Sequence, residues 1–366
     1  LNAGNVLVKV ANLRLSNGGL NIDGNKQTPA AGFDGSHIHL SRLNGTFKHI
    51  AFVKDTLRAN VDLTVRDRSG FELKKLKAAF RFTPQIMEFA SLDLQTGKSR
   101  LGNYYAMKFA DFNRDFGDYI TNVTMEARFH DSKVNTEDIA YFAPELKSWN
   151  RVAQLSGHFQ GTVSHFNVTN LVTKVGATTT LMGNLSMKGL PDINTTRISW
   201  SNGTLLSNQH DLATFVPMLK TVTEPNLAAL GTIIYRGNFN GTVRNFTTNG
   251  ILSSQLGGVK TNISMQLPRR GEPSYTGNIE TSRFNIGKFL NNDQLGLADF
   301  KGKITGSSFN VEKLKTKLDG NISSIEFNDY TYTNIVTNGT FQKKYFSGEV
   351  KINAPNLNFT SDVQID

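Results

Sequence analysis

The sequence predicts an all-β protein, in which an elongated antiparallel sheet curls into an open trough, with two or three short helices. Apolar and polar residues alternate strictly in many segments, so each predicted strand has one apolar and one polar face. Asn-Gly and Asp-Gly pairs, which suit tight hairpin turns, recur along the chain. Apolar residues make up only 38% of the 366 residues, which fits a thin sheet. Tandem β-sandwiches are the alternative fold.

The strands are predicted from the alternating segments, taken in chain order. From Leu57 to Val65 every second residue is apolar, and polar residues such as Arg58 lie between them. The segment from Val123 to Phe129 follows the same scheme, as do shorter segments later in the chain. Because side chains on one face of neighbouring strands touch, we expect these apolar positions to line the trough. They are Leu57, Ala59, Val61, Leu63, Val65, Val123, Met125, Ala127, Phe129, Leu185, Met187, Ile263, Met265, Leu267, Ile325, Phe327, Val350 and Ile352.

A ten-residue phrase recurs and predicts a repeating unit. It begins at Asp138, returns at Asp211, and its front half recurs at Asn285. Near-constant spacing indicates one supersecondary unit stacked on the next. Residues 1–366 are therefore interpreted as one repetitive β-groove segment, with units beginning near 138, 211 and 285. The first two copies each predict a helix, which an internal proline keeps short. Bends are expected at the glycine pairs that follow the copies, which are Gly157 with Gly161, Gly237 with Gly241, and Gly302 with Gly306.

The sequence contains no recognisable catalytic or metal-binding pattern. Thr96 to Ser99 resembles the end of a phosphate-binding loop, but Leu92 stands where the leading glycine is required. His37 and His39 share one strand face, and no acidic or histidine partner has suitable spacing, so both are interpreted as exposed strand residues. The chain has no cysteine, which excludes disulfides and thiolate metal sites. We therefore expect no enzyme activity, no cofactor and no metal.

The net charge of +10 arises in part from short basic clusters, which are Lys74–Arg81, Arg269–Arg270, Lys313–Lys317 and Lys343–Lys344. Basic patches attract anionic lipid or nucleic acid, but lysine also keeps exposed strand faces soluble, and this second interpretation is favoured. Aromatic residues occupy the alternating apolar positions rather than positions beside Arg and Lys. Nucleic-acid binding is therefore not expected.

Several short phrases stand in a distinctive order along the chain. They are Phe33–Leu40, Arg68–Phe71 followed by Leu92–Thr96, Asp138–Lys147, Gly189–Asp192, Tyr275 with Gly277, and Phe346 with Gly348. Together they resemble the TamB family of AsmA-like envelope proteins, especially the version found in Bacteroidota. The resemblance implies a periplasmic β-trough with an apolar interior, in a protein anchored to the inner membrane. It also implies a role in moving phospholipid toward the outer membrane and in assisting an Omp85-type barrel during outer-membrane protein assembly.

The favoured function is a lipid conduit whose trough holds phospholipid acyl chains. Each buried CH₂ contributes about 0.8 kcal/mol, so an apolar trough removes most of the roughly 20–25 kcal/mol that a two-chain lipid loses in water. Two alternatives stay open: a scaffold that holds outer-membrane strands for an Omp85-type barrel, and a surface β-repeat adhesin. The chain opens at Leu1 and ends in a strand-like stretch at Asp366. We expect it to be part of a longer polypeptide that carries the membrane anchor and the barrel-docking region.

Overall fold

The computed structural model describes residues 7–24, 28–34, 36–141, 151–215, 217–220, 222, 225–343, 345–354 and 357–365. Strands account for 68% and helices for 10% of the structure. Within the described residues, 21 strands form an open, curled antiparallel sheet. The predicted all-β fold with an open sheet is therefore confirmed, and the described strands do not form tandem β-sandwiches.

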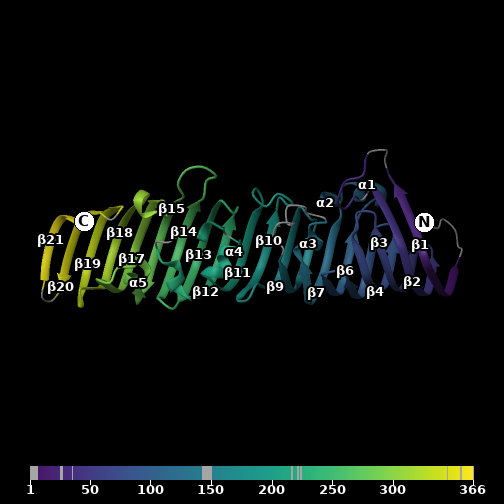
Figure 1. Ribbon diagram of the computed structural model, residues 1–366, viewed down its shortest axis with the longest axis horizontal. Coiled ribbons are helices and arrows are strands. Elements are labelled where there is room, and N and C mark those ends of the chain that lie inside the picture. The colour runs from purple at the N-terminus through teal and green to yellow at the C-terminus, as the bar shows by residue number, and fades with distance from the viewer. Residues whose placement is uncertain are drawn as a thin grey trace. The chain divides into compact units, whose positions relative to one another are not determined.

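The chain divides into two compact units, and the N-terminal unit consists of Leu1–Gly176 and Asn184–Thr196. Its strands β1 to β9 pair antiparallel, each with the next along the chain (Figure 1). They are β1 (Val8–Asp23), β2 (His37–Val53), β3 (Thr56–Asp67), β4 (Glu72–Thr83), β5 (Ile86–Gln95), β6 (Arg100–Lys108), β7 (Thr124–Asn135), β8 (Val152–Gly161) and β9 (His165–Val175). The short helices in its described part are α1 (Phe112–Gly117), α2 (Tyr119–Asn122) and α3 (Thr136–Ile139).

The C-terminal unit consists of Ala177–Gly183 and Arg197–Asp366, so β10 (Thr179–Lys188) has residues in both units. The other strands of this unit are β11 (Arg197–Asn208), β12 (Thr232–Gly241), β13 (Asn245–Ser254), β14 (Gly257–Gln266), β15 (Ser274–Ser282), β16 (Phe284–Asn285), β17 (Leu295–Ser307), β18 (Lys315–Phe327), β19 (Tyr330–Gln342), β20 (Tyr345–Ala354) and β21 (Leu357–Ile365). They pair antiparallel in order, except that β15 and the short β16 both pair with β17. Its helices are α4 (Gln209–Phe215), α5 (Ile286–Leu290) and the 3-10 turns η2 (Pro217–Lys220), η3 (Leu227–Leu230) and η4 (Val311–Lys313).

Burial confirms the predicted strand faces. In β3, Ala59 and Val61 are buried, whereas Asn60 between them and Arg58 and Asp62 on either side are exposed. The same alternation runs through β14 and β18 of the C-terminal unit, where inward residues are half-buried and outward residues exposed. A period of two is what a pleated strand imposes on its side chains. The sheet therefore has an inner, apolar face and an outer, polar face.

Bulges and positive-φ residues curl the sheet. Ser91 (φ 51°) and Asp131 (φ 45°) lie where the register of β5 against β6, and of β7 against β8, shifts. A bulge adds a residue to one strand and increases its local twist. Gly161 (φ 132°) and Gly241 (φ 141°) end their strands at positions where the sequence predicts bends.

In each of the first two copies of the recurring phrase, the leading aspartate lies in a short helix and accepts hydrogen bonds from an earlier hairpin turn. The Oδ2 atom of Asp138 accepts a 2.6 Å hydrogen bond from the Thr96 hydroxyl, in the turn between β5 and β6. Asp211 Oδ2 accepts bonds of 2.7 and 2.6 Å from the N–H and hydroxyl of Thr178, in the turn between β9 and β10. The predicted helices are confirmed as α3 and α4, although residues 142–147 of the first copy lie outside the described residues. The segment that resembles a phosphate loop is a hairpin turn.

Helices α1 and α2 are not predicted by the sequence pattern. They contain six and four residues, too few to show a helical period. Asp111 caps α1 by accepting a 2.8 Å bond from the Arg114 N–H. The Arg114 guanidinium lowers the pKa of Asp115 to about 2, and the Asp115 carboxylate accepts the backbone N–H groups of Ala110 and Asp111. Local capping therefore builds a helix that periodicity does not reveal.

Candidate functional site

The inner face of the N-terminal unit carries continuous apolar rows. Successive cross-strand partners from β3 to β9 are Ala59, Phe80, Phe89, Tyr105, Ala127, Phe159 and Val168. A second row contains Leu57, Phe82, Met87, Met107 and Met125. The predicted lining residues in and next to β3 and β7 are all buried or half-buried; they are Leu57, Ala59, Val61, Leu63, Val65, Met125, Ala127 and Phe129, together with Val123, which lies between α2 and β7.

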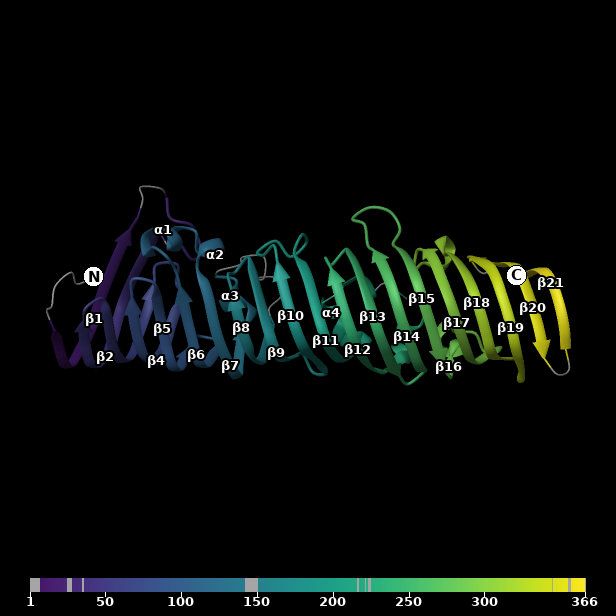
Figure 2. The same ribbon diagram turned by 180° about the vertical axis from the view of Figure 1, so that it is seen from behind.

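Helices α1 and α2 cover part of this inner face. Phe116 and Val123 are buried, and they pack against Phe82 and Met107 of the sheet. Both views place the two helices on the side of the unit where β1 connects to β2 (Figures 1 and 2). The protein's own helices therefore cover part of the second apolar row, at Phe82 and Met107.

Tyr119 of α2 joins the helix to the sheet. Its hydroxyl lies 2.8 Å from the hydroxyl of Tyr105, and its ring meets Phe33 edge-on at 5.3 Å between centroids. Burial raises the pKa of Tyr105 well above its ordinary value, and burial also raises the pKa of Tyr119. Both hydroxyls therefore stay protonated at physiological pH, as an apolar surrounding requires.

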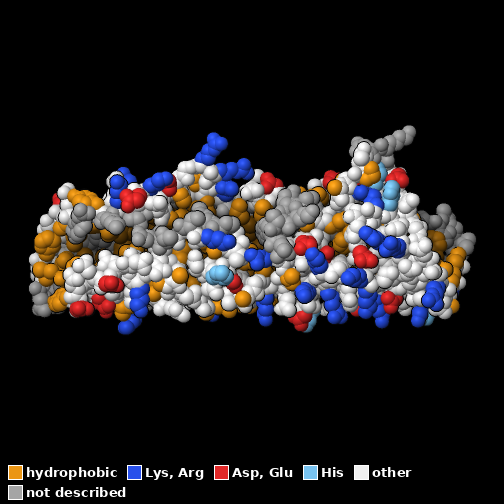
Figure 3. Space-filling view, viewed as in Figure 1, with side chains coloured by type: hydrophobic (Ala, Val, Ile, Leu, Met, Phe, Trp, Pro, Cys, Tyr) orange, Lys and Arg blue, Asp and Glu red, His pale blue; other side chains and the backbone are white. Residues whose placement is uncertain are grey.

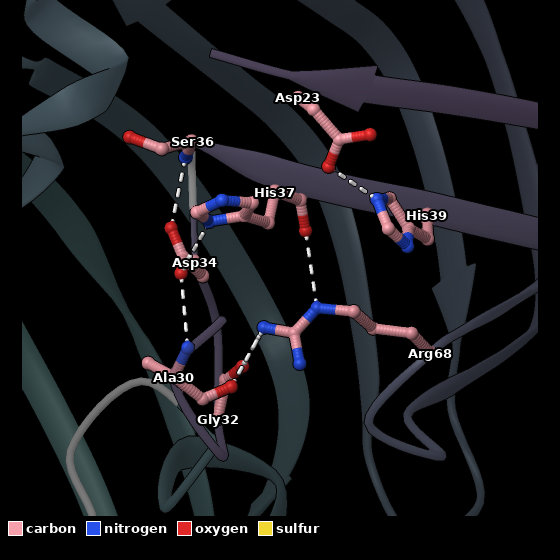
Figure 4. Close-up of polar contacts among 8 residues, drawn as sticks. All are labelled: Asp23, Ala30, Gly32, Asp34, Ser36, His37, His39 and Arg68. Atoms are coloured by element: carbon pink, nitrogen blue, oxygen red, sulfur yellow. Dashed lines mark hydrogen bonds and ion pairs between the residues drawn. The ribbon is translucent and has the colours of Figure 1, made fainter. Parts of the chain in front are cut away.

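The segment that joins β1 to β2 is held to the sheet by Arg68 (Figure 4). Arg68 Nη2 donates to the carbonyl oxygens of Ala30 (2.7 Å) and Gly32 (3.2 Å), and its Nε donates to that of His37 (3.1 Å). One guanidinium thus satisfies two carbonyl groups of this segment and the carbonyl group of the first residue of β2. This geometry holds Phe33 against the inner face.

Asp34 organises the same segment from within. Its carboxylate accepts the N–H groups of Ala30 (3.0 Å) and Ser36 (2.9 Å), and it lies 2.9 Å from His37 Nδ1 (Figure 4). Burial would raise the pKa of Asp34, but the hydrogen bonds from Ala30, His37 and Ser36 outweigh burial and lower it. The carboxylate therefore stays ionised and holds the backbone N–H groups of Ala30 and Ser36.

The interpretation of the two strand histidines as exposed and without acidic partners is wrong. His37 is only 4% exposed and contacts Asp34 at 2.9 Å. His39 Nε2 lies 2.6 Å from Asp23 Oδ1 on the neighbouring strand. One partner comes from a turn and the other from across the sheet, so neither shows as a spacing within one strand.

Tyr141, together with Phe33 and helices α1 and α2, covers the inner face of the N-terminal unit. Its ring stacks on Phe71 at 4.7 Å and meets Phe33 at 6.2 Å between centroids. Its hydroxyl donates a 2.6 Å hydrogen bond to Asp67 Oδ2, and burial, followed by this bond, raises the pKa of Tyr141. A mainly apolar cavity of about 150 Å³ remains among Phe33, Phe71, Tyr141 and the sheet. The inner face of the N-terminal unit is thus largely filled by its own chain.

Replacing Tyr141 with phenylalanine tests this cover. Asp67 loses a donor, so we expect the free energy of unfolding to fall by about 1–2 kcal/mol at pH 7. Burial would raise the pKa of Asp67, but the bonds from Tyr141 and Ser69 outweigh it, and the pKa lies below the ordinary 3.8.

A lowered carboxylate pKa contributes stability above the ordinary value and loses it as the pH falls through the lowered one. The difference between wild type and Tyr141→Phe should therefore shrink between pH 7 and pH 3, in urea unfolding followed by circular dichroism. Tyr332→Phe is the control, since no hydrogen bond of the Tyr332 hydroxyl is present in the described structure. An equal difference at both pH values would contradict the role given to Asp67.

Most apolar side chains on the inner face of the C-terminal unit are half-buried. One row of successive partners contains Trp200, Phe239, Thr248, Ile263, Gly277, Ile304, Leu318 and Gly339. A second row contains Leu205, Tyr235, Leu252 and Val259, and on later strands Phe300, Ile322, Ile335 and Ile352. Figure 3 shows a hollow in this unit, with hydrophobic side chains gathered at its β19–β21 end. In the described chain, both clusters of buried hydrophobic residues lie in the N-terminal unit.

Between these two rows runs a strip with few side chains, termed the glycine strip. Its glycines form two groups of cross-strand partners. The first group is Gly203, Gly237 and Gly250, and the second is Gly302 and Gly320. A Cβ atom on Gly237 would lie 2.2 Å from the carbonyl oxygen of Asn249, and one on Gly302 would lie 2.4 Å from that of Asp319. Only glycine permits such a close approach of neighbouring backbones.

Aromatic rings flank the glycine strip. The ring of Trp200 comes within 2.3 Å of the position a Cβ would take on Gly203. The ring of Phe300 comes within 2.7 Å of the position that a Cβ would take on Gly302. The missing side chains are therefore replaced by rings that lie over the backbone. The inner face along the strip is therefore a surface of aromatic and aliphatic side chains, with glycine backbone beneath the rings.

The outer face of the C-terminal unit is polar. Asn238, Asn249, Asn262 and Asn278 are successive cross-strand partners. The side-chain amide of Asn238 donates a 2.9 Å bond to Asn249 Oδ1. Exposed amide and hydroxyl groups interact with water, so this face needs no covering layer.

The remaining predicted lining residues lie in β10 and the C-terminal strands. Ile263, Met265, Leu267, Ile325, Val350 and Ile352 are half-buried. Phe327, beside the turn between β18 and β19, is 39% exposed. Leu185 and Met187 are half-buried in β10, where alternation is weak. Sequence reasoning missed Trp200, Tyr235 and Phe300; a signal was present, since each stands two or three residues before a glycine of the strip.

The chain matches no protein-family model, and no curated protein or solved structure is significantly similar to it. No helix in the described ranges is long and apolar enough to cross a membrane. The same ranges contain no group of three or more His, Asp or Glu residues placed to hold a metal ion. Support for a function therefore comes from the apolar inner face itself.

Proposed function

We propose that the inner face of the C-terminal unit binds phospholipid acyl chains and that the protein is a segment of a periplasmic lipid conduit, as its resemblance to the TamB family implies. In this proposal the membrane anchor and any contact with an Omp85-type barrel belong to other parts of a longer chain. The observation that carries the proposal is an open sheet whose inner face presents half-buried apolar rows while its outer face is polar. Apolar surface of this kind marks the place where an apolar partner binds.

The inner face suits a long, featureless hydrocarbon chain. Aromatic rings cover the glycine strip, and rows such as Ile263–Ile304–Leu318 supply further apolar surface. Each CH₂ that leaves water contributes about 0.8 kcal/mol wherever along the row it binds. Because this attraction is non-directional, a chain can slide from one strand to the next without breaking a specific bond. No side chain has to react.

The N-terminal unit imposes a condition on transport. Its inner rows are covered by Phe33, Tyr141 and the α1–α2 helices. A lipid can lie on those rows only after the cover moves. Bound lipid is therefore expected first in the C-terminal unit.

Site-specific photocrosslinking tests the proposal. A photoreactive residue at Leu318 or Met265, on the inner face, should crosslink to phospholipid in cell envelopes. The same residue at Lys317 or Ser264 is the matched control, because each is the exposed, outward-facing neighbour on the same strand. Lipid crosslinks from the outward positions alone would refute the proposal.

The same experiment separates the two alternatives. Crosslinks to unfolded polypeptide from the inner positions would favour the scaffold that holds outer-membrane strands. The adhesin alternative needs aromatic rings on the outer face. Instead, Trp200, Phe239 and Phe246 lie in inner rows of the C-terminal unit, which gives that alternative less support.

A further inference from the structure

The strand ends of the C-terminal unit differ in charge. At one end, the described turns hold five basic and two acidic residues; these turns are residues 242–244, 267–273, 308–314 and 343. At the other end, the described connections hold three of each; these are residues 209–215, 217–220, 225–231, 255–256, 283–294 and 328–329. The first end is termed the basic rim and the second the neutral rim. Figure 3 shows Lys and Arg side chains gathered along the upper edge of this unit, where Figures 1 and 2 place the β14–β15 loop.

The basic rim is one continuous structure. Backbone hydrogen bonds of 2.7, 2.8 and 2.9 Å link its consecutive turns, from the N–H groups of Leu267, Ser308 and Lys343 to the carbonyl oxygens of Arg244, Pro273 and Leu314. Arg269, Arg270, Lys313 and Lys343, which stand apart in the sequence, therefore lie along one edge. The inner-face residues nearest this edge are Phe246, Met265 and Tyr275, which are successive cross-strand partners.

Arg244 is the most enclosed cation of this rim. Its Nε is buried and has no hydrogen-bond partner in the described structure, while Nη1 reaches the Leu267 carbonyl oxygen at 3.5 Å. A buried N–H without an acceptor is costly, and more so on a charged group. An anionic oxygen at this position would supply the missing acceptor.

Most other cations of the basic rim are not neutralised. Lys313 pairs with Glu272 at 2.7 Å. No ion pair within the described chain involves the remaining ones, which are Arg269, Arg270 and Lys343. The rim thus presents a surplus of positive charge directly above an apolar surface.

We propose that the basic rim binds the phosphate of a lipid with a net negative headgroup, while its acyl chains lie on the inner face. This inference rests on the proposed function and adds the class of lipid. The acyl chains match the apolar rows, and the anionic headgroup matches the surplus charge one residue row away. The neutral rim offers no such match, so the lipid binds in one orientation across the sheet.

The charge complementarity makes the affinity selective. Cations near an anionic headgroup attract it within about a Debye length, which is about 8 Å at physiological salt. A zwitterionic headgroup gains far less, because its own cation offsets the phosphate. Preference for anionic lipid should therefore weaken as salt is added, whereas apolar binding of the chains should persist.

The test compares fluorescent phosphatidylglycerol and phosphatidylcholine of equal chain length, titrated into the full chain. A triple variant carries Arg269→Gln, Arg270→Gln and Lys343→Gln at the basic rim. The matched control carries Lys260→Gln, Lys303→Gln and Lys351→Gln, which remove the same charge from exposed positions of the outer face. Native mass spectrometry confirms that each complex holds lipid rather than a vesicle.

We expect the wild type to prefer phosphatidylglycerol and the rim variant to lose roughly tenfold or more of that affinity while binding phosphatidylcholine as before. The control should keep the preference. Equal wild-type affinities, or a preference that survives in the rim variant, would overturn this inference and leave the proposed function standing. Association with anionic vesicles without a lipid complex would also overturn it, by making the rim a membrane-docking edge. Absence of binding to either lipid would instead count against the proposed function.

Discussion

Replacing Gly237 with valine is expected to lower the free energy of unfolding by about 3 kcal/mol or more. A Cβ at this position would lie 2.2 Å from the Asn249 carbonyl oxygen and 2.7 Å from Gly250 Cα. Both obstacles are backbone atoms of a paired strand, so they cannot move aside without breaking the β12–β13 register. The two γ-methyl groups of valine would also meet the Tyr235 ring, whose hydroxyl oxygen lies 2.7 Å from the added Cβ.

Urea unfolding and hydrogen exchange together measure this effect. Exchange should accelerate in β12 and β13 first, which locates the damage in the C-terminal unit. Gly258→Ala is the matched control, because the nearest atoms to its added Cβ are 3.9 and 4.0 Å away; its cost should stay near the roughly 1 kcal/mol spanned by β propensities. An unfolding midpoint for Gly237→Val equal to that of the wild type would show that the glycine strip is not a close backbone contact.

Replacing Ile263 with aspartate is expected to reduce lipid affinity by roughly a hundredfold. Ile263 lies in the apolar row between Thr248 and Gly277, where a bound acyl chain would touch it. Placing an aspartate against hydrocarbon costs about 2.5–3.5 kcal/mol, and each 1.4 kcal/mol is a factor of ten in affinity. The residue is half-buried, so in the lipid-free protein the carboxylate can still reach water and the fold should persist.

Ser264→Asp provides the control for that substitution. It adds the same charge to the same strand at the exposed, outward-facing neighbour. Transfer of a labelled phospholipid between vesicles should be lost with Ile263→Asp and kept with Ser264→Asp, with matching circular dichroism spectra for both. Equal transfer by the two variants would show that lipid transfer does not depend on the inner face.

Much of the fold is predictable because its information is local. A period of two assigns the faces of β3, β7, β14 and β18, and Gly-x-apolar-x-Gly marks positions such as Gly237 and Gly302 where neighbouring backbones come close. The recurring aspartate can also be recognised from the local sequence, but its partner cannot. The partner is a hydroxyl group in an earlier turn, as Thr96 is for Asp138.

What the sequence does not reveal comes from contacts between distant residues. The N–H of Phe33 donates a 2.9 Å bond to the carbonyl oxygen of Tyr141. Arg68 donates to the carbonyl oxygens of Ala30 and Gly32, next to Phe33. No periodic pattern encodes such a contact, so the cover of the N-terminal inner face could not be foreseen. The basic rim is hidden for the same reason, because its clusters meet only when alternate hairpin turns line up.

The most direct test of the account is native mass spectrometry of the full chain, purified from cell envelopes in mild detergent. We predict adducts with phospholipid masses on the wild type, and their loss when Ile263→Asp is introduced. A wild-type protein that carries no phospholipid, and that takes none up when incubated with vesicles, would contradict the claim that its open inner face is a lipid-binding surface.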